Sequence, residues 1–232
     1  MRTNPHTSTT TIIRTAMLLG VFVGLILVAF ATIGLHSPLT MPGGTTCIFE
    51  AVVPLLVYGL IAFWTPALGL MHRGPTIQIG TGVGILGGVL QIAHLALENF
   101  GHRIGENAAV TLGFMLSGFV VWGVAGYWVT RASRDIKAGV AAGCWSAMVS
   151  VLMAVTFGLV LITFSFPPTG YVSTWNEFRQ SGWTDARAFA LANSFESVFS
   201  HLTAGPVAGA IFGFFGAAVA RIISGACSNP KA

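Results

Sequence analysis

Charged residues are scarce in this 232-residue sequence. Asp, Glu, Lys and Arg make up 8% of it, whereas hydrophobic residues make up 54%. Soluble domains carry about 25% charged residues, so a soluble globular domain is excluded. The 29 glycines agree with a lipid-embedded protein, because small residues let membrane helices approach one another closely. The first partner that the sequence predicts is therefore the lipid bilayer.

Cysteine is also rare, and basic residues are never clustered into a run. The three cysteines, Cys47, Cys144 and Cys227, show no C-x-x-C spacing. This excludes a disulfide framework and a cysteine-based zinc site. The basic residues are scattered between apolar blocks and form no stripe, which argues against nucleic acid as a partner.

The common catalytic motifs are missing. The sequence contains no P-loop, no G-x-S-x-G and no H-E-x-x-H. No Asp, Glu or Lys lies deep within an apolar segment, which disfavours a proton-coupled pump. An enzyme built from this chain would have to work within the bilayer or at its surface, and we expect no cofactor.

Six apolar segments are long enough to span a membrane, for which about 20 residues are needed. They are 12–35, 48–71, 76–97, 108–130, 138–166 and 203–225. We expect an all-α polytopic bundle forming one membrane domain over 11–226, with a disordered N-terminus at 1–10 and a short tail at 227–232. An alternative is that residues 1–31 are a cleaved signal peptide, since Ala29-Phe30-Ala31 resembles a cleavage site.

The distribution of basic residues predicts the orientation. Eight of the eleven fall on the side of the two termini if all six segments span the membrane: Arg2, Arg14, Arg73, Arg131, Arg134, Lys137, Arg221 and Lys231. Because Lys and Arg favour the cytoplasmic side, we expect both termini in the cytoplasm. The compact, short-looped layout favours the cell membrane of a bacterium, that is, its inner membrane.

One connection, residues 167–202, is longer than the others. Its second half carries apolar residues at helical spacing: Ala188, Leu191, Phe195, Val198 and Leu202. This pattern predicts an amphipathic helix. We expect it to lie on the outer membrane surface as a cap that leads into the last span.

The odd-numbered spans carry glycines four residues apart. These are Gly20 and Gly24, then Gly80, Gly84 and Gly88, then Gly139 and Gly143. The repetition indicates three tandem helical hairpins around a pseudo-threefold axis, although alternating spans can share such features without being repeats. Helix faces lined by small residues four positions apart also favour a homo-oligomer or a membrane-protein partner.

Candidate functional residues gather at the expected outer end of the third span. His94, Glu98, His102 and Glu106 follow one another at intervals of four, which places them on one face of a continuous helix. Glu196 and His201 precede the last span. We interpret these six residues as a candidate ligand-binding or pH-sensing site.

A metal site at His94, Glu98 and His102 is an alternative. Gly101 and Gly105 oppose it, because they favour a helix that ends near Phe100. A haem held by His94 and His201 is a further alternative. Plain interfacial polarity explains the cluster better than these alternatives, because His and Glu at a membrane boundary commonly pair with each other or with solvent.

Three functions follow from these features. The first is a small-solute transporter or a membrane substrate-binding subunit, which agrees with the glycine-rich spans and with prolines that interrupt helices lining transporter sites. The second is a non-catalytic membrane scaffold or accessory subunit. The third is a metal- or haem-dependent intramembrane enzyme with an outer-face His/Glu site.

Overall fold

The computed structural model describes residues 5–34, 39, 41, 43–64, 74–100, 108–165 and 176–227. These residues form helices and no strand, and six of the helices are long and apolar enough to cross a membrane. The expected all-α polytopic bundle is confirmed. The helices are α1 (Pro5–Gly34), α2 (Gly44–Trp64), α3 (Gly74–Phe100), α4 (Ala108–Ser133), α5 (Ile136–Phe164), α7 (Asn176–Ser181) and α8 (Ala186–Cys227).

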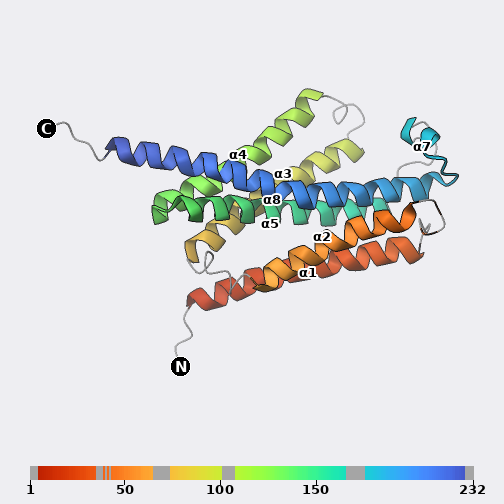
Figure 1. The fold of residues 1–232 in the computed structure, drawn as a ribbon, viewed down its shortest axis with the longest axis horizontal. Coiled ribbons are helices and arrows are strands. Elements are labelled where there is room, and N and C mark those ends of the chain that lie inside the picture. Colours follow the sequence, from red (N-terminus) through yellow and green to blue (C-terminus); the bar gives the residue numbers. More distant parts are fainter. Residues whose placement is uncertain are drawn as a thin grey trace.

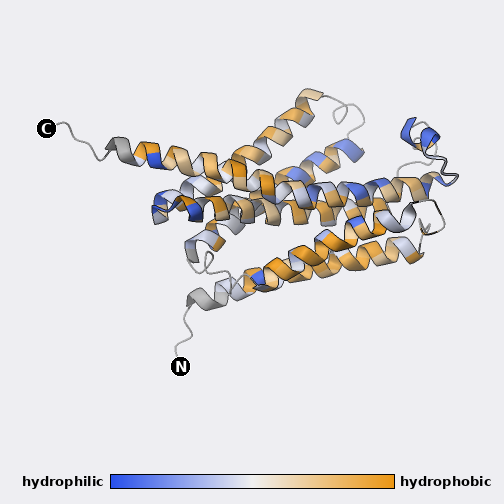
Figure 2. Ribbon diagram, in the orientation of Figure 1, coloured by the Kyte–Doolittle hydropathy of each residue, from blue (hydrophilic) through white to orange (hydrophobic). Residues whose placement is uncertain are grey.

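The long helices run along the molecule and separate its polar residues into two ends (Figures 1 and 2). We call one the basic end. It holds the start of α1, the α4–α5 turn and the end of α8, with Arg14, Arg131, Arg134, Lys137 and Arg221. We call the other the acidic end. It holds the start of α2, the end of α3, α7 and the start of α8, with Glu50, Glu98, Glu177, Asp185 and Glu196.

Helix α5 is the centre of the bundle. It packs against α1, α3, α4 and α8. Its most apolar window is 61% buried, whereas that of α1 is 39% and those of α3 and α4 are 22%. The hairpins α1–α2, α3–α4 and α5–α8 each pack internally. However, α1, α3 and α5 are not equivalent, because only α5 is enclosed by neighbours, so the expected pseudo-threefold arrangement is wrong.

Glycines allow α4, α5 and α8 to touch through their backbones. A Cβ atom on Gly126 of α4 would strike the backbone of Gly213 on α8, and one on Gly143 of α5 would strike the carbonyl of Gly209. Elsewhere on α5, a Cβ on Gly84 of α3 would lie 2.7 Å from the carbonyl oxygen of Ser146. Small residues at these contacts therefore set how closely the helices approach.

The last span differs from its sequence prediction. Residues 186–202 and the apolar segment after them form one helix of 42 residues, α8, with a length of roughly 63 Å at 1.5 Å per residue. The predicted apolar face is correct, since Ala188, Leu191, Phe195, Val198 and Leu202 are at most 4% exposed. That face packs within the bundle, where α8 contacts α2, α4 and α5. The expected separate surface helix is therefore wrong.

Proline does not end α8. Pro206 lies inside the helix, and Gly205 beside it packs on Val151 of α5. A proline removes one backbone hydrogen bond, a loss that membrane helices tolerate when neighbouring groups compensate. Gly209 packs in turn on Ala147 of α5, so contacts before and after Pro206 hold the two halves of α8 in one helix.

Candidate functional site

The candidate site follows one face of α3. Its members recur at alternating intervals of four and three residues, which keeps them on a single stripe. The stripe is Gly80, Gly84, Gly87, Gln91, His94 and Glu98. Glycine occupies it toward the basic end, and polar side chains occupy it toward the acidic end, where hydrophilic colour covers the last turns of α3 in Figure 2.

Polar groups of α4 and α5 fill the glycine part of the stripe. Trp145 Nε1 on α5 donates a 2.9 Å hydrogen bond to Thr81 Oγ1 on α3. Trp122 Nε1 on α4 donates a 2.9 Å hydrogen bond to Ser150 Oγ on α5. Ser150 Oγ would also lie 3.6 Å from a Cβ on Gly87. Three helices therefore share one line of polar contacts.

We call this line the polar seam. Nearer the acidic end it continues between α3 and α4, where Gln91 Nε2 would lie 3.8 Å from a Cβ on Gly118. Its members are Thr76, Thr81, Gln91 and His94 of α3, Trp122 of α4, and Trp145, Ser146 and Ser150 of α5. All are uncharged when His94 is neutral, so the seam offers hydrogen-bonding groups without a fixed charge.

Three atoms of the polar seam are buried without a hydrogen-bond partner in the described part of the chain. They are Thr76 Oγ1, Ser146 Oγ and His94 Nε2. Thr76 is 1% exposed and Ser146 is 0% exposed. An unpaired buried polar group costs free energy, so these atoms are suited to pair with a water molecule or a polar ligand. Tyr58 on α2 and Thr163 at the end of α5 carry similar unpaired hydroxyls.

His94 is held between α3 and α4. Its ring stacks on Phe114 of α4, with ring centroids 5.0 Å apart and planes inclined by 24°. Its Nε2 lies 3.2 Å from Glu98 Oε1, one turn further along α3. Nε2 makes no aligned hydrogen bond with this oxygen, so the two side chains are in close polar contact only. The structure therefore brings together the first two residues of the predicted site.

Glu196 and His201 lie elsewhere. Both are exposed on α8, and His201 Nδ1 lies 2.7 Å from the carbonyl oxygen of Ser197. Glu196 is within electrostatic range of Cys47 on α2, because this half of α8 packs beside α2 while His94 packs against α4.

The described ranges contain no group of three or more His, Cys, Asp or Glu residues able to hold a metal ion. Glu196 and His201 thus do not complete a metal site with His94 and Glu98. His102 and Glu106 lie outside the described residues, so the set of His94, Glu98 and His102 stays a prediction. Helix α3 ends at Phe100, as its following glycines indicate.

Sequence reasoning missed most of the polar seam. It assigned no functional role to Trp122, Trp145, Ser146 or Ser150. A usable signal was present, because Ser146 and Ser150 are one turn apart within an otherwise apolar span. That signal becomes meaningful only when α5 is known to face the glycine stripe of α3.

No family model, no curated protein and no solved structure matches this chain. Its function is therefore argued from the arrangement of its own residues.

Proposed function

We propose that this membrane protein is a transporter, or a membrane substrate-binding subunit, for a small polar solute without net charge. The supporting observation is a set of buried polar atoms in the polar seam without a hydrogen-bond partner: the hydroxyls Thr76 Oγ1 and Ser146 Oγ, and His94 Nε2, whose contact with Glu98 is not an aligned hydrogen bond. Thr76 and His94 lie on one stripe of α3, which meets α5 at Ser146 and meets α4 at Phe114. A solute with hydroxyl or amide groups would supply the hydrogen bonds that these atoms lack.

The chemistry of the polar seam favours an uncharged solute. Its donors and acceptors are hydroxyl, indole, amide and imidazole groups, and an ion would need compensating charge in a low-dielectric interior. Gln91, His94 and Glu98 would form the entrance at the acidic end, with Phe114 as one wall.

A scaffold or accessory subunit is the second candidate function. It is favoured by the Trp145–Thr81 and Trp122–Ser150 hydrogen bonds, which join α3 and α4 to α5. Such bonds stabilise membrane bundles without any ligand. The metal-dependent enzyme depends on His102, which lies outside the described ranges. The haem alternative needs His94 on α3 and His201 on α8, and no described contact brings these two residues together.

The proposed location is the cell membrane, with both termini in the cytoplasm. The basic end carries five of the described Lys and Arg residues, and the acidic end carries Arg179 and Arg187. Short loops rich in Lys and Arg stay on the cytoplasmic side. This bias supports the assignment of the basic end to the cytoplasm and the polar seam's entrance to the outer face.

Ser146→Ala tests the proposal directly. Because Ser146 Oγ has no hydrogen-bond partner in the described structure, its removal should leave the melting temperature of the solute-free protein unchanged or raise it. A panel of neutral solutes (glycerol, erythritol, urea and acetamide) would be screened by thermal unfolding and by uptake into proteoliposomes. A bound solute raises the melting temperature by mass action.

We expect at least one of these solutes to stabilise the wild-type protein and to bind about threefold to tenfold more weakly to Ser146→Ala, the loss of one hydrogen bond. Ser194→Ala is the matched control, since Ser194 Oγ already donates to Ala190 within α8 and lies outside the polar seam. If no solute in the panel changes the stability or crosses the membrane, the scaffold function is favoured instead.

A further inference from the structure

The α4–α5 turn gathers positive charge at the basic end. Arg131, Arg134 and Lys137 lie within seven residues of one another, and all three are exposed. The one acidic residue between them, Asp135, caps α5 by accepting a 2.9 Å hydrogen bond from the Lys137 backbone. The turn therefore keeps a net positive charge on a surface that faces away from the bundle.

Arg134 occupies a backbone conformation in which glycine is usual. Its φ angle is 57°, and its backbone N–H donates a 2.7 Å hydrogen bond to the carbonyl of Thr130 at the end of α4. A helix that ends in this way commonly has glycine at this position, because a side chain strains the left-handed conformation. Arginine at a strained position points to a role for its side chain.

Aromatic residues mark the depth of this cluster in the membrane. Trp128 is 51% exposed, and tryptophan and tyrosine favour the headgroup level of a bilayer. Arg131 Nη1 donates a 3.1 Å hydrogen bond to the Tyr127 hydroxyl, and its guanidinium lies 6.0 Å from the Trp128 ring. Arg131 is about 4.5 Å further along the helix axis than Trp128, so it lies closer to the basic end than this aromatic residue.

An apolar ridge leads along α4 to this aromatic pair. Its residues recur every four positions and are at least 38% exposed: Leu112, Leu116, Val120, Val124 and Trp128. Residues at this spacing form one continuous stripe on a helix. The stripe is long enough to lie against an acyl chain whose headgroup reaches the basic turn.

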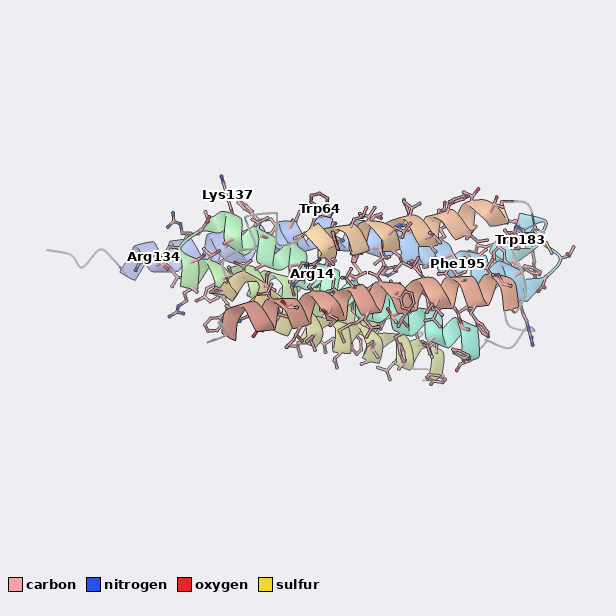
Figure 3. The ribbon with its side chains drawn as sticks, turned by 90° about the horizontal axis from the view of Figure 1, so that it is seen from below. Arg14, Trp64, Arg134, Lys137, Trp183 and Phe195 are labelled. Carbon is pink, nitrogen blue, oxygen red and sulfur yellow. The ribbon has the colours of Figure 1, made fainter. Side chains whose placement is uncertain are left out.

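Arg134 and Lys137 lie further toward the basic end than Arg14 and Trp64 (Figure 3). Trp64 is 59% exposed, and the Arg14 guanidinium lies 4.8 Å from the ring of Phe63. This second contact between an arginine and an aromatic ring marks the boundary between the apolar layer and the lipid headgroups on α1 and α2. The α4–α5 turn therefore reaches beyond the apolar layer, into the region of lipid headgroups.

We propose that Arg131, Arg134 and Lys137 bind the headgroup of an anionic phospholipid whose acyl chain lies along the apolar ridge of α4. The arginine and lysine side chains supply charge-assisted hydrogen bonds to phosphate oxygens. The ridge distinguishes a phospholipid from a free anion. This lipid site is separate from the polar seam and does not depend on the transport proposal.

Quenching of Trp128 fluorescence by brominated lipids tests the site. The full chain would be reconstituted in phosphatidylcholine vesicles that contain an equal fraction of brominated phosphatidylglycerol or brominated phosphatidylcholine. The contribution of Trp128 is the difference between each protein and its Trp128→Phe counterpart. We expect brominated phosphatidylglycerol to quench Trp128 more strongly, with a binding preference of about fivefold for each basic residue involved.

Two sets of variants make the test specific. Arg131→Gln with Lys137→Gln should remove most of the preference, whereas Arg179→Gln with Arg187→Gln at the acidic end should leave it unchanged. Arg134→Gly should lower the preference about fivefold while keeping or raising the melting temperature, because it relieves the backbone strain. Loss of lipid preference together with retained stability would separate binding from folding.

Equal quenching by the two brominated lipids would overturn the proposal. So would an unchanged preference in the Arg131, Lys137 and Arg134 variants. A third overturning result is competition by millimolar inorganic phosphate in phosphatidylglycerol-containing vesicles, since this would make the turn a free-anion site that needs no acyl chain.

Discussion

At the scale of single residues, the close packing of this bundle depends on glycines, which have no Cβ atom. Gly126 illustrates this, because a methyl group there would meet the backbone of Gly213 on α8. A backbone cannot move aside as a flexible side chain can, so α4 and α8 would have to separate. We expect Gly126→Ala to lower the free energy of unfolding by about 1–3 kcal/mol, the range for overpacked sites, as measured by denaturant or thermal unfolding in detergent micelles.

Gly113→Ala is the control for this prediction. Gly113 lies on the same helix, and a Cβ atom there would have no neighbour within 4 Å. Its substitution should change the stability by less than about 0.5 kcal/mol, as expected for an open surface site. Equal effects of the two substitutions would contradict the close approach of α4 and α8 at Gly126.

At the scale of helices, α8 is amphipathic, and its two faces lie in different surroundings. Phe195 is fully buried, and Phe199, one turn later, is 41% exposed. We expect Phe195→Ala to destabilise the protein by about 3–5 kcal/mol, as for other buried phenylalanines. Phe199→Ala should cost less than about 1 kcal/mol, and thermal unfolding of both variants would measure the difference.

This pair of variants also distinguishes between two arrangements: α8 packed against the bundle, as in the structure, and the surface helix that the sequence predicts. A helix lying flat on the membrane would insert its apolar face into lipid, and truncation of Phe195 would then weaken membrane contact without unfolding the bundle. Similar unfolding free energies for the Phe195 and Phe199 variants would therefore favour the surface helix and contradict the packing of α8 against the bundle.

The two interpretations of residues 186–202 show what periodicity can and cannot predict. Helical spacing identified the correct apolar residues, because that spacing is a local property of the chain. It could not identify the surface that covers them, since α2 and α5 are far from α8 in sequence. The same reason explains why Glu196 lies near Cys47 of α2, when it was expected to lie beside His94.

At the scale of the whole molecule, composition and hydropathy were sufficient for the six spans, and local spacing was sufficient for the contact between His94 and Glu98. The polar seam could not be predicted in this way. Its hydrogen bonds join residues 28 and 64 positions apart, and α5 becomes central only through packing against four other helices. The pattern of a single segment, such as Ser146 and Ser150 one turn apart, does not show which other helix that segment faces.

The positions of the two ends predict which cysteines are accessible from which side. Cys47 is in the first turn of α2 at the acidic end, and Cys227 is the last residue of α8 at the basic end. We expect an impermeant maleimide to label a Cys47-only variant in right-side-out vesicles and a Cys227-only variant in inside-out vesicles. A Cys144-only variant should need detergent, because Cys144 lies more than two turns inside α5 and is partly buried.

Each pattern of labelling has a distinct meaning. Labelling on opposite sides agrees with an odd number of crossings between the two cysteines, which the five helices α2, α3, α4, α5 and α8 provide. Labelling of both cysteines from the same side would mean that one of these five helices does not cross the membrane. Helix α8 would be the first candidate, because it is longer than the bilayer is thick. Opposite labelling with Cys47 on the inside would keep the fold but invert the molecule. The basic turn of α4 and α5 would then face outward, against the positive-inside bias.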